Sequence, residues 1–390
     1  MRNLVLIPLF VLIIGCTQKP DKIKQLVNHA DAQFEYALER IEDESTDTNI
    51  LPRSIENGTI KLVAPSDWTS GFFPGNLWMM YELTGDEKWK TRAIKFTLPL
   101  ENEKWNDKDH DIGFKMYCSF GHAIKYIDDI NYHNILIQSA KTLATRYNPQ
   151  VACIRSWDSN PNTAHWAYPV IIDNMMNLEL LLWAAKETGN ESFKEIAIRH
   201  AQTTMKNHFR EDYSCYHVVD YDPETGAVLH KHTHQGAYDE SDWARGQAWA
   251  LYGYTMMYRE TNMDEFLSQA ENIADYLLSV NGLKEGKVPY WDFKAKNIPN
   301  EPLDASAAAI YASALFELYS YDQKDEYLEM ANNLLNTLSS AEFLAPIGQN
   351  EGFLLKHSTG SKPFNSEINS PLVYADYYYL EAIINRKNLE

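Results

Sequence analysis

Two kinds of helical segment alternate along this chain of 390 residues, and no other feature constrains its fold as much. One kind is amphipathic, with apolar residues at helical spacing on one side, as at Ala331, Leu335 and Leu338. The other kind is apolar on several faces, which is typical of a buried helix. The amphipathic segments are expected near residues 21–43, 86–101, 131–147, 190–209, 264–280 and 324–340. The buried segments are expected at Gly71–Thr84, Gly113–Ile127, Pro169–Thr188, Trp243–Thr261, Leu303–Tyr321 and Pro371–Asn385.

Six amphipathic and six buried segments in alternation predict an all-α fold of six helical hairpins, an (α/α)6 toroid with the buried helices inside. Turns such as Thr84-Gly85-Asp86 fit this prediction, because Gly suits a helix C-terminus. An α-solenoid would give the same coarse pattern. However, the repeats share no sequence signature and the last segment is as apolar as the others, which favours a closed ring. No composition break divides residues 21–390, so we expect a single domain, with short strands in loops such as Tyr213–Leu229.

The first sixteen residues, MRNLVLIPLFVLIIGC, resemble a bacterial lipoprotein signal. The apolar run from Leu4 to Ile14 is too short for a permanent bilayer span. We therefore expect a signal peptide over residues 1–15, lipidation of Cys16 and a short tether over residues 16–20. The chain would then be an exported lipoprotein of a Gram-negative bacterium, periplasmic or anchored in the outer membrane. A plain signal peptide with a chance cysteine is the alternative.

Charge and cysteine content narrow the range of functions. The chain has 35 basic and 54 acidic residues, a net charge of −19, which argues against non-specific binding to nucleic acid. Cys118, Cys153 and Cys215 form no CxxC pair, so we expect three buried or half-buried thiols, with one disulfide as an alternative. The alternating histidines of LHKHTHQG, residues 229–236, are interpreted as a polar loop in preference to a metal site. The sequence makes no prediction of oligomeric state.

Polar and aromatic residues gather where the buried segments begin, and in a toroid these positions share one rim. The chain also has ten Trp and twenty-four Tyr, whose rings suit stacking on sugar faces. Asp111 stands at such a position, as a functional carboxylate or as an ordinary helix N-cap. Asp173 lies among Ile171, Ile172 and Met175, where burial would raise its pKa to a range useful for a general acid. The alternative is an Asp173 satisfied by an arginine or by backbone donors.

Several motifs, taken together and in order, resemble the unsaturated glucuronyl hydrolases of glycoside hydrolase family 88. They are WTSGFFPG at Trp68–Gly75, HDIGF at His110–Phe114, DNMMN at Asp173–Asn177, Tyr216-His217, THQG at Thr233–Gly236, WARGQAW at Trp243–Trp249 and DYYYLE at Asp376–Glu381. The resemblance covers essentially the whole mature chain and implies an (α/α)6 barrel.

The resemblance also implies a substrate and site roles. The substrate would be a lyase-generated oligosaccharide, from a glycosaminoglycan or a related glycan, that ends in a Δ4,5-unsaturated uronic acid. Asp173 would be the general acid and base, and Asp111 its carboxylate partner. The substrate-binding residues would be Trp68 and Trp249 as aromatic walls, His217, Gln235 and Arg245 on the unsaturated sugar, and Ser358, Ser361 and Lys362 near the next sugar. No metal and no cofactor are expected.

Two other functions remain as alternatives. One is an unsaturated rhamnogalacturonyl hydrolase of family 105, with a pectin-derived substrate and the same ring. The spacing of HDIGF, THQG and WARGQAW favours family 88 over this reading. The other is a non-catalytic glycan-binding lipoprotein, which would use the aromatic residues but would not need both Asp111 and Asp173.

Overall fold

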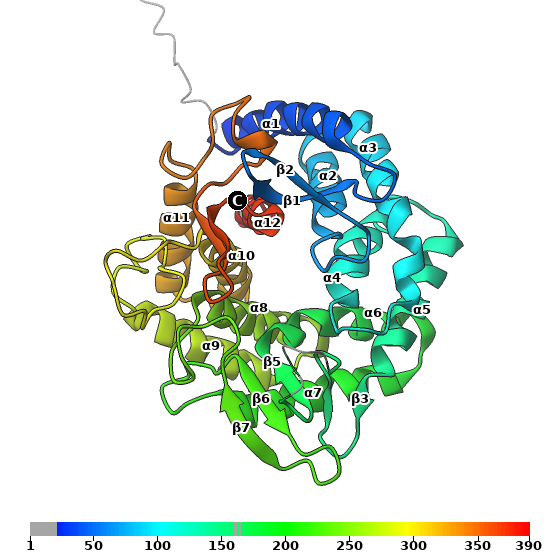
Figure 1. Cartoon of the computed structure of the whole chain (residues 1–390), viewed down its shortest axis with the longest axis vertical. Coiled ribbons are helices and arrows are strands. Elements are labelled where there is room, and N and C mark those ends of the chain that lie inside the picture. Colours follow the sequence, from blue (N-terminus) through cyan, green and yellow to red (C-terminus); the bar gives the residue numbers. More distant parts are fainter. Residues whose placement is uncertain (1–21, 160–162, 164) are drawn as a thin grey trace, which may run out of the picture.

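The computed structural model describes residues 22–159, 163 and 165–390, and it confirms the predicted alternation of inner and outer helices. Figure 1 shows the helices arranged as a ring around the centre of the molecule. The outer helices are α1 (Lys22–Glu44), α3 (Glu87–Thr97), α5 (Ile130–Ala144), α7 (Glu191–His208), α9 (Asp264–Ser279) and α11 (Asp325–Leu338). The inner helices are α2 (Phe72–Thr84), α4 (Ile112–Met116), α6 (Leu178–Thr188), α8 (Ala244–Thr261), α10 (Ala305–Asp322) and α12 (Val373–Asn388).

The ring is closed. Each inner helix contacts the next, in part through short helical turns at the starts or ends of α4 and α6. The last inner helix, α12, packs on α10 and also on the first, α2. The chain is therefore a single-domain (α/α)6 toroid, and the solenoid alternative is wrong.

The tight turns between paired helices follow from local sequence. Gly85 and Gly189 end α2 and α6 in the left-handed conformation, with φ of 68° and 69°. The next residue in each turn, Asp86 or Asn190, caps the following outer helix by accepting a backbone N–H bond. These turns fold each outer helix back along its inner partner.

Two inner segments depart from the expected continuous helices. The segment predicted at 113–127 has only the five-residue α4, followed by the π-helical turn η2 (Tyr117–Gly121). The segment predicted at 169–188 begins as strand β5 (Pro169–Ile171) and the 3-10 helix η3 (Ile172–Asn177) before α6 starts. Pro169 and the β-branched residues after it favour an extended backbone, which pairs with strand β6 (Val218–Tyr221). Asp173 therefore stands just beyond a strand end.

Short antiparallel strands lie in the loops, including the region where we expected them, Tyr213–Leu229. They are β1 (Leu51–Glu56) with β2 (Thr59–Val63), β3 (Tyr147–Asn148) with β4 (Cys153–Ile154), β6 (Val218–Tyr221) between β5 and β7 (Val228–His232), and β8 (Ser358–Ser361) with β9 (Ser366–Ser370). The remaining turns are the 3-10 segments η1 (Leu98–Trp105) and η4 (Asn350–Gly352).

Aromatic side chains fill the centre of the ring. Phe72 contacts Phe114 and Tyr378, with ring centroids 5.3 and 6.1 Å apart, and Trp249 contacts both Phe114 and Tyr378 at 5.4 Å. These four side chains are buried. The toroid therefore has a packed core, and the site is a cavity above this core.

Two other features bear on earlier expectations. Cys118, Cys153 and Cys215 are free thiols, and the last two are buried, so the predicted thiols are confirmed over the disulfide. Across residues 22–159, 163 and 165–390, no helix has the length and apolar character that crossing a bilayer requires. The predicted signal peptide, Cys16 and the tether lie outside the described residues.

Candidate active site

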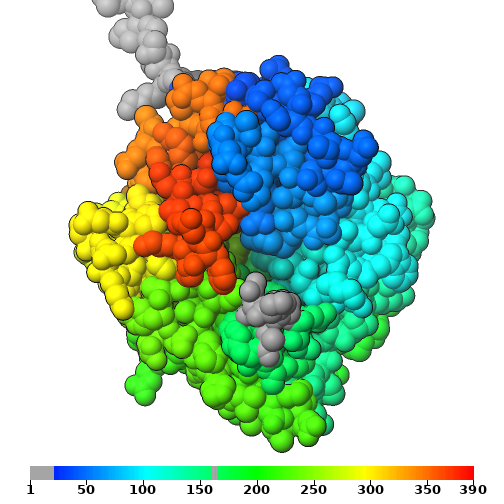
Figure 2. All heavy atoms as spheres, in the orientation of Figure 1, coloured from blue at the N-terminus to red at the C-terminus, as the bar shows by residue number. Residues whose placement is uncertain are grey.

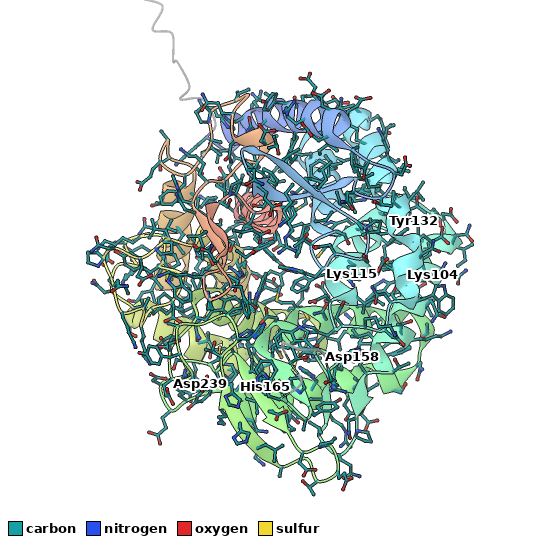
Figure 3. All side chains as sticks on the ribbon, in the orientation of Figure 1. Lys104, Lys115, Tyr132, Asp158, His165 and Asp239 are labelled. Carbon is teal, nitrogen blue, oxygen red and sulfur yellow. The ribbon has the colours of Figure 1, made fainter. Side chains whose placement is uncertain are left out.

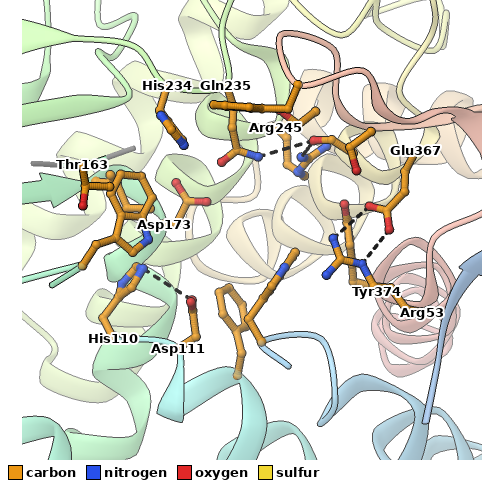
Figure 4. A pocket seen from close by; sticks show the side chains of 18 residues that line it. Arg53, His110, Asp111, Thr163, Asp173, His234, Gln235, Arg245, Glu367 and Tyr374 are labelled. Atoms are coloured by element: carbon orange, nitrogen blue, oxygen red, sulfur yellow. Dashed lines mark hydrogen bonds and ion pairs between the residues drawn. The ribbon is translucent and has the colours of Figure 1, made fainter. Parts of the chain in front are cut away.

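A cavity of about 350 Å³ opens on the face of the ring that carries the hairpins. Figure 2 shows the surface hollowed where the blue β1–β2 region, the orange-red β8–β9 hairpin and green residues meet. The side chains that line it come from loops and from the first turns of inner helices (Figure 4). The starts of the buried segments share this rim, as the sequence predicts.

Asp173 lines the cavity from η3 and is only 9% exposed. Its Oδ2 has no hydrogen-bond partner among the described residues. Burial raises the pKa of Asp173 to about 7, whereas the charge of Arg245 and hydrogen bonds from its own backbone and from Trp249 act to lower it. The alternative of an Asp173 fully satisfied by an arginine or backbone donors is therefore wrong. The carboxyl can hold or release a proton near neutral pH.

His217 lies beside Asp173, with its Nε2 atom 3.6 Å from Asp173 Oδ2. Its Nδ1 accepts hydrogen bonds from the backbone N–H groups of His234 and Gln235, at 3.0 and 3.1 Å. Because Nδ1 is an acceptor, the neutral ring carries its proton on Nε2. Burial and neighbouring positive groups hold the pKa of His217 well below its usual range. His217 therefore presents a neutral N–H group toward Asp173.

Asp111 lines the same cavity at the start of α4. It occupies the N-cap position but makes no side-chain cap hydrogen bond, so the interpretation as an ordinary cap is wrong. Its Oδ1 lies 3.4 Å from Nε2 of His110 (Figure 4). Burial, and then the charges of Asp109 and Asp173, raise the pKa of Asp111 well above its usual value. The structure thus brings the two predicted carboxylates to one cavity.

Arg245 also lines the cavity, but most of its donors bind within the protein. It pairs with Asp304 at 2.7 Å and donates to the backbone oxygens of Thr359, at 2.6 Å, and Gly360. The guanidinium therefore fixes the β8 strand at the cavity edge. Its positive charge remains close enough to lower the pKa of Asp173.

The two predicted aromatic walls occupy different depths. Trp68 lines the cavity and contacts Tyr374, with ring centroids 5.0 Å apart. Trp249 is buried in the aromatic core below the cavity. Trp157, which the sequence analysis missed, lines the cavity from a loop and stacks on Trp166 at 5.7 Å. No helical periodicity marks that loop, so only its two tryptophans could have indicated it.

The remaining predicted binding residues also divide into those that line the cavity and those that do not. Gln235 and Ser361 line the cavity, and Ser361 Oγ has no hydrogen-bond partner among the described residues. Ser358, the first residue of β8, is buried and does not line the cavity. Lys362 pairs with Glu301 and does not line the cavity. The structure therefore brings the first two to the site and leaves the other two outside it.

Further lining residues were not predicted. Arg53 of β1 lines the cavity and binds Glu367 of β9 at 2.6 Å (Figure 4). It also binds Asp67, at 2.8 Å. His234 lines it as well, so the segment interpreted as a polar loop contributes directly to the site. Within the part of the chain that the structure describes, no three His, Cys, Asp or Glu side chains are grouped to hold a metal ion.

Comparison with known proteins gives a consistent family. Residues 38–387 match the family described as Glycosyl Hydrolase Family 88. The chain is 47% identical to an unsaturated glucuronyl hydrolase of Formosa agariphila, over all of this chain and 99% of the relative. It is 33% identical to an unsaturated chondroitin disaccharide hydrolase of Streptococcus agalactiae, over 84% of this chain and 83% of that protein.

Solved structures agree with this result. A crystal structure of an unsaturated glucuronyl hydrolase specific for heparin superposes with a TM-score of 0.89 at 46% identity, over 94% of this chain and 97% of the other. The unsaturated glucuronyl hydrolase of Bacillus sp. GL1, described as responsible for the degradation of glycosaminoglycan, gives a TM-score of 0.84 at 26% identity, with the same coverage.

Proposed function

Because the chain belongs to glycoside hydrolase family 88, we propose that it releases the terminal Δ4,5-unsaturated uronic acid from lyase-generated glycosaminoglycan or related oligosaccharides. The family match and the named relatives support a glycoside hydrolase of this type. The observation that carries the proposal is Asp173. It is a buried carboxyl whose pKa is raised to about 7, and one of its oxygens has no partner within the described part of the chain, in a cavity shared with Asp111.

The reaction begins at the double bond of the substrate. An unsaturated uronic acid contains an enol ether, C4=C5–O, and protonation at C4 leaves an oxocarbenium-like charge at C5. A group that gives this proton at neutral pH must stay protonated there, which the raised pKa of Asp173 allows. The neutral N–H of His217 faces the same carboxyl and can stabilise its ionised form after the proton has left.

Water then completes the hydration. The Asp173 carboxylate takes a proton from water as the water oxygen bonds to C5, which restores the acid. The resulting hemiketal opens, and the second sugar leaves as the ring collapses. Asp111 lines the same cavity and can hold the sugar or Asp173 during these steps. Carboxylate spacing does not predict the stereochemistry here, because the anomeric carbon is not attacked.

Other lining residues bind the sugar. Trp68 and Trp157 offer aromatic faces for the pyranose ring, whereas Gln235 and Ser361 offer polar groups. Arg245 contributes positive charge and holds the edge of the cavity through the backbone of β8. Trp249, in the core below the cavity, lowers the pKa of Asp173 through a side-chain hydrogen bond. In this scheme the chain's own side chains move every proton, with no cofactor and no metal.

A substrate panel tests the proposal. Protein that starts near residue 20 is incubated with lyase digests of heparin, chondroitin and rhamnogalacturonan, and loss of the double-bond absorbance is followed. Turnover of a glycosaminoglycan digest is expected. Turnover of the rhamnogalacturonan digest alone would support the family 105 type of activity. Binding of an unsaturated disaccharide without any loss of absorbance would contradict the proposed enzyme.

For the start of the chain, we propose that Cys16 is lipidated and anchors the protein to a membrane of a Gram-negative bacterium, with the catalytic domain in the periplasm or at the outer membrane. The apolar run before Cys16 and the preceding Gly15 support this proposal. One acyl chain gives weak anchoring, and stable anchoring needs more than one.

Expression of the full chain in a Gram-negative host tests the anchor. Incorporation of labelled fatty acid and recovery in the membrane fraction are expected for the natural chain and not for Cys16→Ser. A natural chain that is released in soluble form without label would indicate a plain signal peptide.

A further inference from the structure

Asp111 is held by two charged neighbours that do not line the cavity. Its backbone N–H donates to Oδ1 of Asp109 at 2.9 Å, and its carbonyl accepts from the backbone N–H of Lys115 at 3.0 Å. The ammonium of Lys115 lies 3.3 Å from each oxygen of Asp109, which closes a loop of contacts around Asp111. The three residues thus form one braced turn at the start of α4.

Lys115 is an unusual residue for this place. Its side chain is 0% exposed, and it lies on the inner helix α4, inward of Lys104 in Figure 3. Removal of a lysine ammonium from water is costly, and the cost is met only by close negative partners. Asp109 is one such partner, and Glu103 is another at 4.0 Å. An apolar residue would fill this position without that cost, so packing alone does not account for a charge here.

We propose that Asp109 and Lys115 are positioning residues, which hold Asp111 at the cavity wall and set the electrostatic balance around the pair of carboxylates. This inference rests on the proposed function, because it assigns the two residues a part in the same reaction. Neither residue lines the cavity, so both would act through Asp111.

The charges around Asp111 define the expected effect. Asp109 and Asp173, and more weakly Asp67, raise the pKa of Asp111, whereas Lys115 lowers it. His110, also in contact, has its pKa lowered to about 3 by burial and is neutral at working pH. Among these neighbours, Lys115 and Asp109 therefore shift the pKa of Asp111 in opposite directions. Removal of the Lys115 charge should raise that pKa, and removal of the Asp109 charge should lower it.

The experiment measures kcat/KM against pH for variants that alter one charge each. Lys115→Met should shift the acid limb of the profile to higher pH by about one unit, because a positive charge that favours the ionised form of Asp111 is lost. Asp109→Asn should move it downward, since a repulsive charge is lost while an oxygen remains to accept the Asp111 N–H. Lys115→Arg keeps the charge and should remain closer to the natural profile. Lys104→Met is the matched control, because Lys104 pairs with Glu101 on η1, and its profile should not move.

Folded variants with unmoved profiles, or two shifts in the same direction, would overturn the assignment, because a purely structural role changes the melting temperature alone. If Lys115→Met does not fold, Asp109→Asn decides by itself: a downward shift supports the assignment and an unmoved limb overturns it. A natural enzyme without turnover on any digest would overturn the proposed function and the assignment with it. Normal turnover with unmoved profiles would overturn only the assignment.

Discussion

Two aspartates of the inner ring show how similar burial leads to different roles. Asp173, on η3, and Asp376, on α12, are 9% and 1% exposed, and burial raises the pKa values to about 7 and about 8. Both oxygens of Asp376 accept backbone N–H bonds, from Leu354 and Leu355, at 2.8 Å each. Oδ2 of Asp173 has no partner among the described residues and belongs to a cavity-lining side chain. A raised pKa is thus common to both. Asp173 is the candidate acid because its oxygen without a partner among the described residues belongs to a side chain lining a cavity of about 350 Å³, whereas Asp376 lines only a pocket of about 10 Å³.

The largest expected difference between the two aspartates is in turnover. Asp173→Asn should lower kcat by about 10³-fold or more, because the proton donor is removed while shape is kept. Asp376→Asn should leave the folded enzyme active but lower its stability by about 2 kcal/mol, because its amide cannot accept both N–H groups. Absorbance assays and thermal unfolding of both variants measure these effects. Normal turnover by Asp173→Asn would make the acid assignment wrong.

Substitution of Asp111 should resemble substitution of Asp173 and not of Asp376, because it should lower turnover more than stability. Asp111→Asn should lower turnover by about 10²-fold or more, with little loss of melting temperature, because the side chain makes no cap hydrogen bond. The same assay and a melting curve measure both quantities. A variant that melts earlier but turns over normally would restore the interpretation as a cap.

The comparison also predicts a pH dependence of stability. The pKa of Asp173 rises from an ordinary 3.8 to about 7 on folding. Its contribution to the free energy of unfolding is therefore complete below about pH 4 and is lost as pH rises through 7. Asp173→Asn removes this loss and should be more stable than the natural protein at pH 8, with an upper limit of about 4 kcal/mol, and no more stable at pH 4. Denaturant unfolding at the two pH values measures the difference. An equal difference in stability at both pH values would mean that the pKa of Asp173 is not raised in the folded protein.

The smallest expected effect concerns the β8 strand. Ser361→Ala should raise KM severalfold, by about 1 kcal/mol, because its hydroxyl lines the cavity and has no hydrogen-bond partner in the described residues. Lys362→Ala should leave KM nearly unchanged, because the ammonium pairs with Glu301 outside the cavity. Kinetics on one unsaturated disaccharide compare the two. A larger effect from Lys362→Ala would show that the lysine leaves Glu301 to reach the substrate.

The sequence was informative where local pattern decides structure. Helical spacing was enough to predict the toroid, and an aspartate beside Ile171 and Ile172 was enough to single out Asp173. The strand before η3 was missed because a short apolar run suits a buried helix or a strand equally, and pairing with β6 decides it.

Contacts between distant segments could not be predicted in this way. Arg245 binds Asp304, and Lys362 binds Glu301, across 59 and 61 residues. Nothing local to either cation indicates its partner, and the family resemblance implied only that Arg245 binds the unsaturated sugar and that Lys362 lies near the next sugar. Lys115 was not predicted for the same reason, because its ion pairs with Asp109 and Glu103 form only once the chain has folded.

The position of new hydrogen in the product tests the central claim most directly. When the enzyme works in D₂O, NMR spectra recorded during turnover should show one deuterium at C4 of the released uronic acid, in a single configuration, because one side chain delivers it to one face of the double bond. Asp173→Asn should lose this signal together with turnover. A random mixture of configurations at C4 from the first spectra onward would mean that the double bond reacts only after release, and would contradict protonation of C4 by Asp173.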